Sequence, residues 1–203
     1  VIGDHSTAMG YGNQANDDYS IAIGEQNVAN GLYTTAMGYR NNANGFYSTA
    51  FAKDNFANGY ASMVTGNSNI ANGFSSLVTG VFNDSILSRQ GSPNSSTPLF
   101  IIGNGDNAST RSNAMVVLKS GNVAIGDNGN PVNKLQITGT ITNVGLGDNT
   151  GMMTLGYTSS TNMVIDQNDI QVRLSGAASD LNLQRLGGNI GIGNTGVPAY
   201  QLE

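Results

Sequence analysis

The chain has 203 residues, of which only 10% are charged, against about 25% in typical soluble domains. It contains 28 glycines, one histidine and no cysteine, and its net charge is -5 at pH 7. This composition excludes disulfides, thiolate chemistry and a His-rich metal site, and the lack of a basic cluster argues against nucleic-acid binding.

The first 87 residues are built on a fourteen-residue repeat. Five complete blocks follow one another from Thr7 without an insertion, and a sixth begins at Leu77 and decays. In each block the second position is alanine or valine, the fourth is glycine except at Ala52, and the seventh is asparagine. Dense Gly, Asn, Ser and Thr disfavour a helix, and the period suits two short strands with tight turns. The repeat therefore predicts an all-β solenoid in which each block forms one coil.

Two asparagine columns are predicted to form ladders along the solenoid. Stacked amide side chains can hydrogen-bond from one strand to the next, as in other cross-strand arrays. The ladder residues are Asn13, Asn27, Asn41, Asn55 and Asn69 in the seventh position, and Asn30, Asn44, Asn58 and Asn72 in the tenth.

Alternation along the first strand of each coil separates small residues from large ones. The alanine column would line a narrow interior, and so thin a core offsets only part of the entropy cost of ordering the chain. The larger residues on the other side therefore need a second surface to cover them, which predicts an obligate homo-oligomer. The interface candidates are Met9, Ile21, Ile23, Met37 and Phe51.

Tyr19, Tyr33 and Tyr47 recur one coil apart and allow two interpretations. Exposed tyrosines can stack on sugars or contact a protein receptor, whereas covered ones would fill a seam between subunits or cover the edge of the coils. We favour the structural interpretation. Ice binding by a hydroxyl-rich face is a minor third one, because the threonines are irregularly placed.

The fourteen-residue block resembles the YadA-like head of trimeric autotransporter adhesins. The resemblance rests on "SIAIG" (Ser20–Gly24), "STA" (Ser48–Ala50) and the repeated "ANG", and it covers residues 1–87. It implies a left-handed parallel β-roll in each chain, with three rolls packed about an axis. The departures are Ala52 in the glycine column and Val64 and Val78 in the alanine column, which suggest that the roll changes toward its end.

The second half loses the fourteen-residue register. Residues 88–98 are a polar stretch expected to form a junction loop, and residues 99–141 and 142–203 are expected to be two β fibre segments with interwoven, β-prism-like strands. "GNVAIGDNGNPVNKLQ" (Gly121–Gln136) returns as "GNIGIGNTGVPAYQLE" (Gly188–Glu203). This signature resembles segments of phage-type tail fibres and of large repetitive bacterial surface proteins.

The chain offers little catalytic chemistry. We expect His5 to be a surface residue, Arg111 and Lys119 to be solvated, and the Asp-Asn and Asn-Gly pairs to supply turns, with calcium binding at the acidic turns as an alternative. The acidic turn residues are Asp106, Asp127, Asp148, Asp166 and Asp169, of which Asp166 and Asp169 are weak candidates for paired carboxylates. We therefore expect no enzyme and no cofactor.

The repeats favour a homotrimeric receptor-binding fibre outside the cell. We lean to a tail fibre of a phage-like or contractile injection machine, with an autotransporter-type adhesin and a sugar- or ice-binding solenoid as alternatives. The expected partners are two further copies, a glycan or protein receptor, and fibre or baseplate segments beyond this chain, which we expect to be a fragment. No apolar run is long enough to insert into a membrane.

Overall fold

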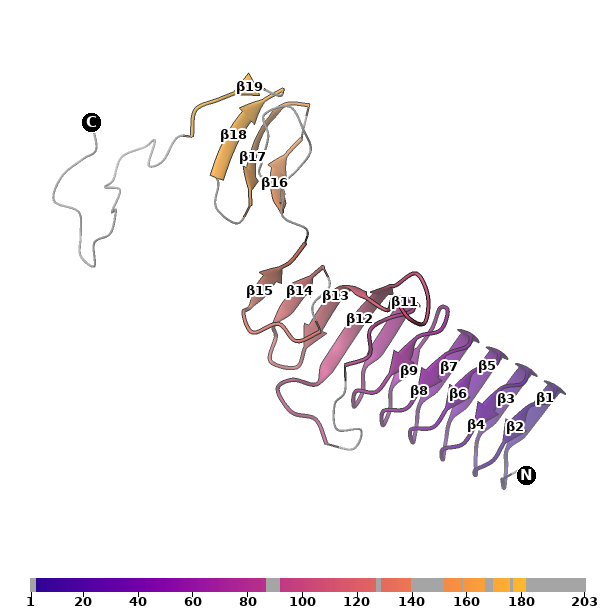
Figure 1. Ribbon diagram of the computed structural model, residues 1–203. Helices are drawn as coiled ribbons and strands as arrows, with labels where there is room; N and C mark the ends of the chain where they lie inside the picture. The colour runs from indigo at the N-terminus through magenta and orange to yellow at the C-terminus, as the bar shows by residue number, and fades with distance from the viewer. Residues whose placement is uncertain are drawn as a thin grey trace. The chain divides into compact units, whose positions relative to one another are not determined.

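The computed structural model describes residues 3–86, 92–126, 129–139, 152–157, 159–166, 170–175 and 177–181 (Figure 1). Every regular element in these ranges is a β-strand, which confirms the expected all-β class. The chain divides into two compact units, residues 1–139 and 140–203.

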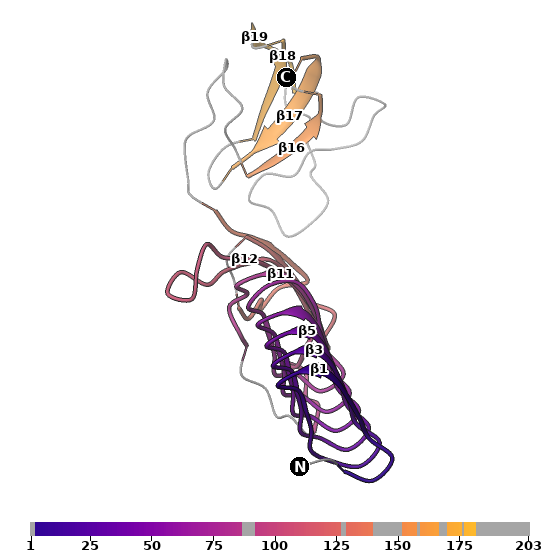
Figure 2. The same cartoon turned by 90° about the vertical axis from the view of Figure 1, so that its right-hand side faces the viewer.

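Most of the first unit is a roll in which each coil contributes one long and one short strand (Figures 1 and 2). The long strands pair in parallel, and each pairing shifts by one repeat, so Ala8 lies beside Ala22 and Ala22 beside Ala36. The expected parallel β-roll of fourteen-residue coils is therefore confirmed. The long strands are β1 (Thr7–Tyr11), β3 (Ile21–Glu25), β5 (Thr35–Tyr39), β7 (Thr49–Lys53), β9 (Met63–Val64) and β11 (Leu77–Val81). The short strands form a second parallel sheet of β2 (Gln14–Ala15), β4 (Val28–Ala29), β6 (Asn42–Ala43), β8 (Phe56–Ala57) and β10 (Ile70–Ala71).

The glycine column allows the long strands to stack closely. Gly24 and Gly38 have φ angles of +115° and +119°, a region that L side chains rarely adopt. A Cβ on Gly24 would also collide with the carbonyl oxygen of Gly38 in the next coil. Ala52 occupies the same column at φ +81° and therefore carries the backbone strain that glycine avoids.

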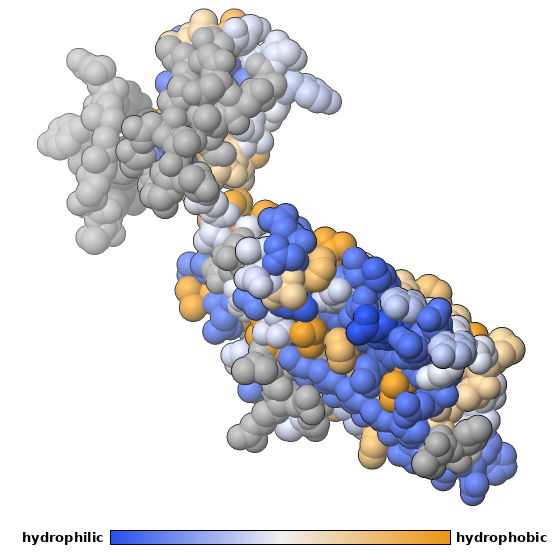
Figure 3. Space-filling view, turned by 45° about the vertical axis from the view of Figure 1, so that its right-hand side comes forward, coloured by the Kyte–Doolittle hydropathy of each residue, from blue (hydrophilic) through white to orange (hydrophobic). Residues whose placement is uncertain are grey.

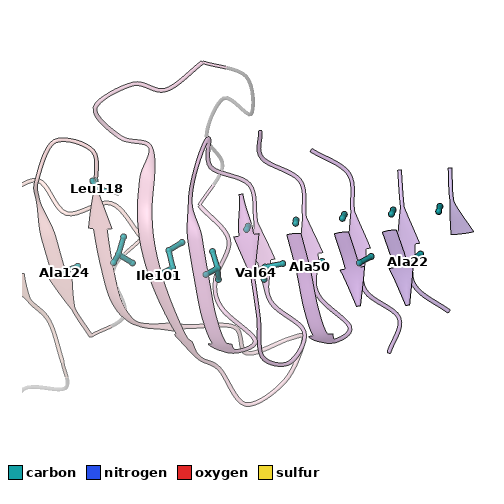
Figure 4. Close-up of a cluster of buried hydrophobic side chains, with 14 residues drawn as sticks. Ala22, Ala50, Val64, Ile101, Leu118 and Ala124 are labelled. Carbon is teal, nitrogen blue, oxygen red and sulfur yellow. The ribbon is translucent and has the colours of Figure 1, made fainter. Parts of the chain in front are cut away.

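The interior of the roll is lined by buried apolar residues of both sheets, and those of the long strands grow larger along the chain (Figure 4). The short strands contribute Ala15, Ala29, Ala43, Ala57 and Ala71. Ala22, Ala36 and Ala50 are fully buried, and Val64 and Val78 continue the line. Ile101 and Val116 then extend it, because Val78 pairs with Ile101 and Ile101 pairs with Val116. The enlargement begins at Val64, in the last coil that has a short strand, and Val78 and Ile101 continue it beyond that strand, β10.

Residues 98–137 continue the long-strand sheet. The sequence instead predicts a separate segment after the junction loop at residues 88–98. β12 pairs in parallel with β11, placing Leu77 beside Phe100 and Gly80 beside Gly103. β13 and β14 then pair antiparallel and β15 pairs in parallel with β14. The added strands are β12 (Pro98–Asn104), β13 (Asn113–Leu118), β14 (Val123–Ile125) and β15 (Leu135–Ile137).

Arg111 joins this extension to the roll, which contradicts its expected solvation. Its Nη1 donates hydrogen bonds to the carbonyl oxygens of Ser68 at 2.8 Å and Asn83 at 3.1 Å. Its guanidinium carbon also lies 5.7 Å from the centroid of the Phe82 ring. Arg111 has no acidic neighbour in the sequence, but it donates hydrogen bonds to backbone carbonyl oxygens of turns that are remote from it along the chain.

The second unit contains a four-stranded antiparallel sheet. Its strands pair in sequence order, with Thr154 beside Val164 and Asn162 beside Arg173. The strands are β16 (Met153–Gly156), β17 (Thr161–Ile165), β18 (Ile170–Leu174) and β19 (Ala177–Ala178).

Candidate functional site

Large apolar side chains line the outer face of the long-strand sheet. Because side chains alternate along a strand, the buried alanine column forces the first and third positions of each coil to point outward. The resulting surface, which we call the long-strand face, comprises Met9, Ile21, Ile23, Met37, Phe51, Met63 and Leu77.

The long-strand face is exposed over the whole length of the roll. Met9 is 59% exposed, Phe51 46% and Met63 47%, whereas Ile23 and Met37 are half-buried by their neighbours in the sheet. All five sequence-predicted interface candidates lie on this face, and the structure adds Met63 and Leu77 to them. In contrast, the side of the roll seen in Figure 3 is mainly hydrophilic.

A buried asparagine ladder runs inside the turn that follows each long strand. Asn41 is 1% exposed, and its Nδ2 donates to the carbonyl oxygens of Met37 at 2.9 Å and Ala52 at 2.7 Å and to Asn27 Oδ1 at 3.1 Å. Asn41 Oδ1 in turn accepts a hydrogen bond from the backbone N–H of Asn55 at 3.1 Å. One side chain therefore satisfies polar groups of three successive coils.

The tenth-position asparagines form a second ladder on the outside of the roll. Asn30 Nδ2 donates to Asn44 Oδ1 at 2.9 Å, Asn44 to Asn58 at 2.8 Å, and Asn58 to Asn72 at 2.9 Å. Asn16 begins this ladder by donating to Asn30 at 2.6 Å. These amides bond mainly to one another, so they stabilise the stacking of coils without supporting the turns.

The tyrosine column forms a continuous stack of rings along one edge of the roll. The ring centroids of Tyr19 and Tyr33 are 4.8 Å apart, those of Tyr33 and Tyr47 are 5.3 Å apart, and the rings are nearly parallel. His5 is exposed, as expected of a surface residue, and its ring extends the stack at one end, 5.1 Å from Tyr19. Tyr47 then meets Tyr60 edge-to-face, at an interplanar angle of 62°, and Tyr60 stacks on Phe74. Tyr60 and Phe74 occupy the twelfth position of their coils instead of the thirteenth.

Stacking limits what the tyrosines can bind. Tyr19, Tyr33 and Tyr47 are each nearly half exposed, but neighbouring rings cover their faces, and a sugar that stacks on an aromatic residue needs a free face. What these rings present to solvent is a row of edges and hydroxyls. The geometry therefore favours the structural interpretation of this column over sugar stacking.

Replacing Tyr33 by alanine is expected to reduce the free energy of unfolding by about 1–3 kcal/mol, because Tyr33 contacts rings on both sides. Ala61 shows that alanine fits this column, at a φ of +51° close to the +57° of Tyr33. The matched control is His5→Ala, which removes one ring contact and should cost about half as much. Urea denaturation of both variants measures the difference, and equal losses would contradict a cooperative stack.

A second exposed apolar face lies on the sheet of the second unit. Leu155, Ile170 and Leu174 are 50%, 58% and 50% exposed. They share one side of the sheet with Met153, Met163, Ile165 and Val172. The opposite side contains Asn162, Val164 and Arg173, all nearly fully buried. The alternation in "NMVID" and "IQVRL" signals this face in the sequence, although we did not predict it there.

The described residues contain no arrangement that points to catalysis or metal binding. They hold no group of three or more His, Cys, Asp or Glu side chains that could bind a metal ion. Asp106 is exposed and Asp166 is largely buried, whereas Asp127, Asp148 and Asp169 lie outside the described residues. In the part of the chain that is described, no helix is long and apolar enough to cross a membrane.

Two copies of the YadA head domain repeat match the chain, at residues 2–25 and 29–51. No curated protein and no solved structure gives a significant match. The matched residues span the coils in which β1, β3, β5 and β7 pair with a one-repeat shift and in which both asparagine ladders are present. Residues 2–25 and 29–51 of this chain are therefore similar to the YadA head domain repeat.

Proposed function

We propose that the chain forms part of a homotrimeric fibre on the outside of a bacterial cell and that this fibre attaches the cell to another surface. The observation that carries the proposal is the long-strand face, a row of large apolar side chains that are exposed or half-buried from β1 to β11. Exposed apolar surfaces of this extent in soluble proteins mark interaction sites. Two further copies of the chain are the simplest partners that could bury the long-strand face, because every coil presents the same kind of apolar surface.

The second unit supports the same assembly. Its apolar sheet face has no charged side chain among its described members, so identical copies can pack on it without burying unpaired charges. Three chains joined through both units would make a fibre that holds its outer surface rigidly. Three copies of a weak site on such a rod bind a surface by avidity, without a strong single contact.

The family match favours a cell-anchored adhesin of the trimeric autotransporter type over a tail fibre of a phage-like or contractile injection machine. The tail-fibre hypothesis depends on the "GNVAIG" segment, whose second copy at residues 188–203 is outside the described residues. A cell-surface glycan or protein receptor remains our proposed partner.

Multi-angle light scattering tests the assembly. The chain has a mass of 21.0 kDa, and particles should contain three chains over a wide range of dilution. A folded monomer would contradict the proposal. Binding to an array of glycans and extracellular proteins then tests attachment. The trimer should bind at low concentrations, and a monomeric variant should not bind at the same concentrations. Equal binding by the monomeric variant would contradict attachment through avidity.

A further inference from the structure

Four coils carry the same tripeptide, Ala-Asn-Gly, at the end of the short strand. The asparagines are Asn30, Asn44, Asn58 and Asn72. Asparagine is a thermolabile residue, and an Asn-Gly pair is the most reactive context because glycine has no side chain to shield its backbone nitrogen. In an unfolded chain the four pairs would be nearly equivalent, so any difference between them comes from the fold.

The fold protects three of the four pairs with backbone hydrogen bonds. The backbone N–H groups of Gly45 and Gly59 each donate to an alanine carbonyl of the next coil at 3.0 Å, and Gly31 does so at 3.3 Å. The amide nitrogens of Asn30, Asn44 and Asn58 also donate along the outer ladder.

The fourth pair lies at the edge of the short-strand sheet. β10, which ends at Ala71, is the last strand of that sheet, so no further short strand accepts hydrogen bonds from Asn72 and Gly73. Asn72 accepts from Asn58, but neither its side-chain nitrogen nor the Gly73 N–H donates to another described residue. The Gly73 backbone is also less tightly covered than those of Gly45 and Gly59. A Cβ built on Gly73 would lie 2.9 Å from Pro98 O, much like the 2.8 Å at Gly31, whereas one on Gly45 or Gly59 would overlap the next coil.

We infer that Asn72 is a modification site, at which the folded roll deamidates in preference to the Ala-Asn-Gly pairs of the three preceding coils. The backbone nitrogen of Gly73 attacks Cγ of Asn72, the bond from Cγ to the side-chain nitrogen breaks, and ammonia leaves with the proton of the Gly73 amide. Water then opens the resulting succinimide to aspartate or isoaspartate. In the other pairs the attacking nitrogen must first give up a hydrogen bond, and the coil above must move.

The modification would act on the connection between the last coil and the strands that follow it. Either product adds a negative charge at the end of the short-strand sheet. Isoaspartate also lengthens the main chain where Gly73 packs against Pro98, the first residue of β12. An ageing fibre would therefore change first at this point, while the stacked coils stay intact.

Peptide mapping by mass spectrometry tests the inference on the full chain. Folded protein is incubated at mildly alkaline pH, with circular dichroism to confirm that the β signal is retained, and a parallel sample is incubated in urea. In the folded sample Asn72 should deamidate about tenfold or more faster than Asn44 and Asn58, because breaking one hydrogen bond costs roughly that factor in rate. Asn30 should be intermediate, because the Gly31 hydrogen bond is longer.

In urea the four sites should deamidate at rates within about twofold of one another, since no fold protects them. Equal rates in the folded sample, or a faster reaction at Asn44, would overturn the inference. A preference for Asn72 that persists in urea would also overturn it, because the local sequence and not the sheet edge would then be the cause. The variant Asn72→Gln serves as the control and should remove the modification from that peptide alone. The measurement does not depend on the oligomeric state, so it is independent of the proposed function.

Discussion

Replacing Asn41 by alanine is expected to lower the free energy of unfolding by about 3 kcal/mol or more. The substitution leaves the carbonyl oxygens of Met37 and Ala52 and the backbone N–H of Asn55 without their side-chain partner inside a closed turn. Each buried polar group that loses its partner costs about 1–3 kcal/mol. Urea denaturation at a fixed protein concentration measures the loss, because concentration alone changes the apparent stability of an oligomer.

The matched control for this variant is Asn44→Ala. Asn44 belongs to the outer ladder, is exposed, and bonds through its side chain to Asn30 and Asn58. Because water can replace those partners, its loss should cost about 1 kcal/mol or less. Similar losses of unfolding free energy for the two variants would show that the buried asparagine ladder does not stabilise the turns. The structural role assigned to that ladder would then be wrong.

Replacing Phe51 by aspartate is expected to convert the proposed trimer into monomers. Phe51 lies on the long-strand face, 46% exposed in the single chain, so the monomer can accommodate the change. In a packed trimer the same substitution would bury three carboxylates without partners, at a cost of several kcal/mol each. Light scattering should therefore show one chain per particle, while circular dichroism retains the β signal.

A phenylalanine of similar exposure on the other sheet provides the control. Phe56 belongs to the short-strand sheet and is 41% exposed. Phe56→Asp should leave three chains per particle, because that sheet faces away from the proposed contact. If Phe51→Asp remains trimeric, or if Phe56→Asp dissociates as readily, the long-strand face is not the interface.

Periodicity explains why so much of the roll could be predicted from the sequence. A fourteen-residue repeat without insertions forces equivalent residues into one column, so the buried alanines, both asparagine columns and the outward apolar residues follow from the alternation of a β-strand. The YadA-like resemblance was likewise predictable, because "SIAIG" and the repeated "ANG" lie in the first coils. The details of the asparagine hydrogen bonds were not, since they depend on which carbonyls the turn brings within reach.

The sequence does not predict that the long-strand sheet continues after the roll, and the reason is physical. An insertion between β11 and β12 breaks the sequence period, but backbone pairing does not require loops of constant length. Only the fold shows that Phe100 lies beside Leu77 and that Ile101 extends the buried line. Arg111 was misjudged in the same way, because its acceptors at Ser68 and Asn83 are remote in the chain.

The sequence by itself determined the coil, its narrow alanine interior and its apolar outer face, because each is a property of one repeat and its immediate neighbours. Only the tertiary structure decided that the stacked tyrosines cover each other's faces, that the long-strand sheet runs on through β15, and that Asn72 is at an edge while Asn44 is not. These properties depend on which strands and rings lie beside one another in space, and the residues of a single repeat do not specify those neighbours.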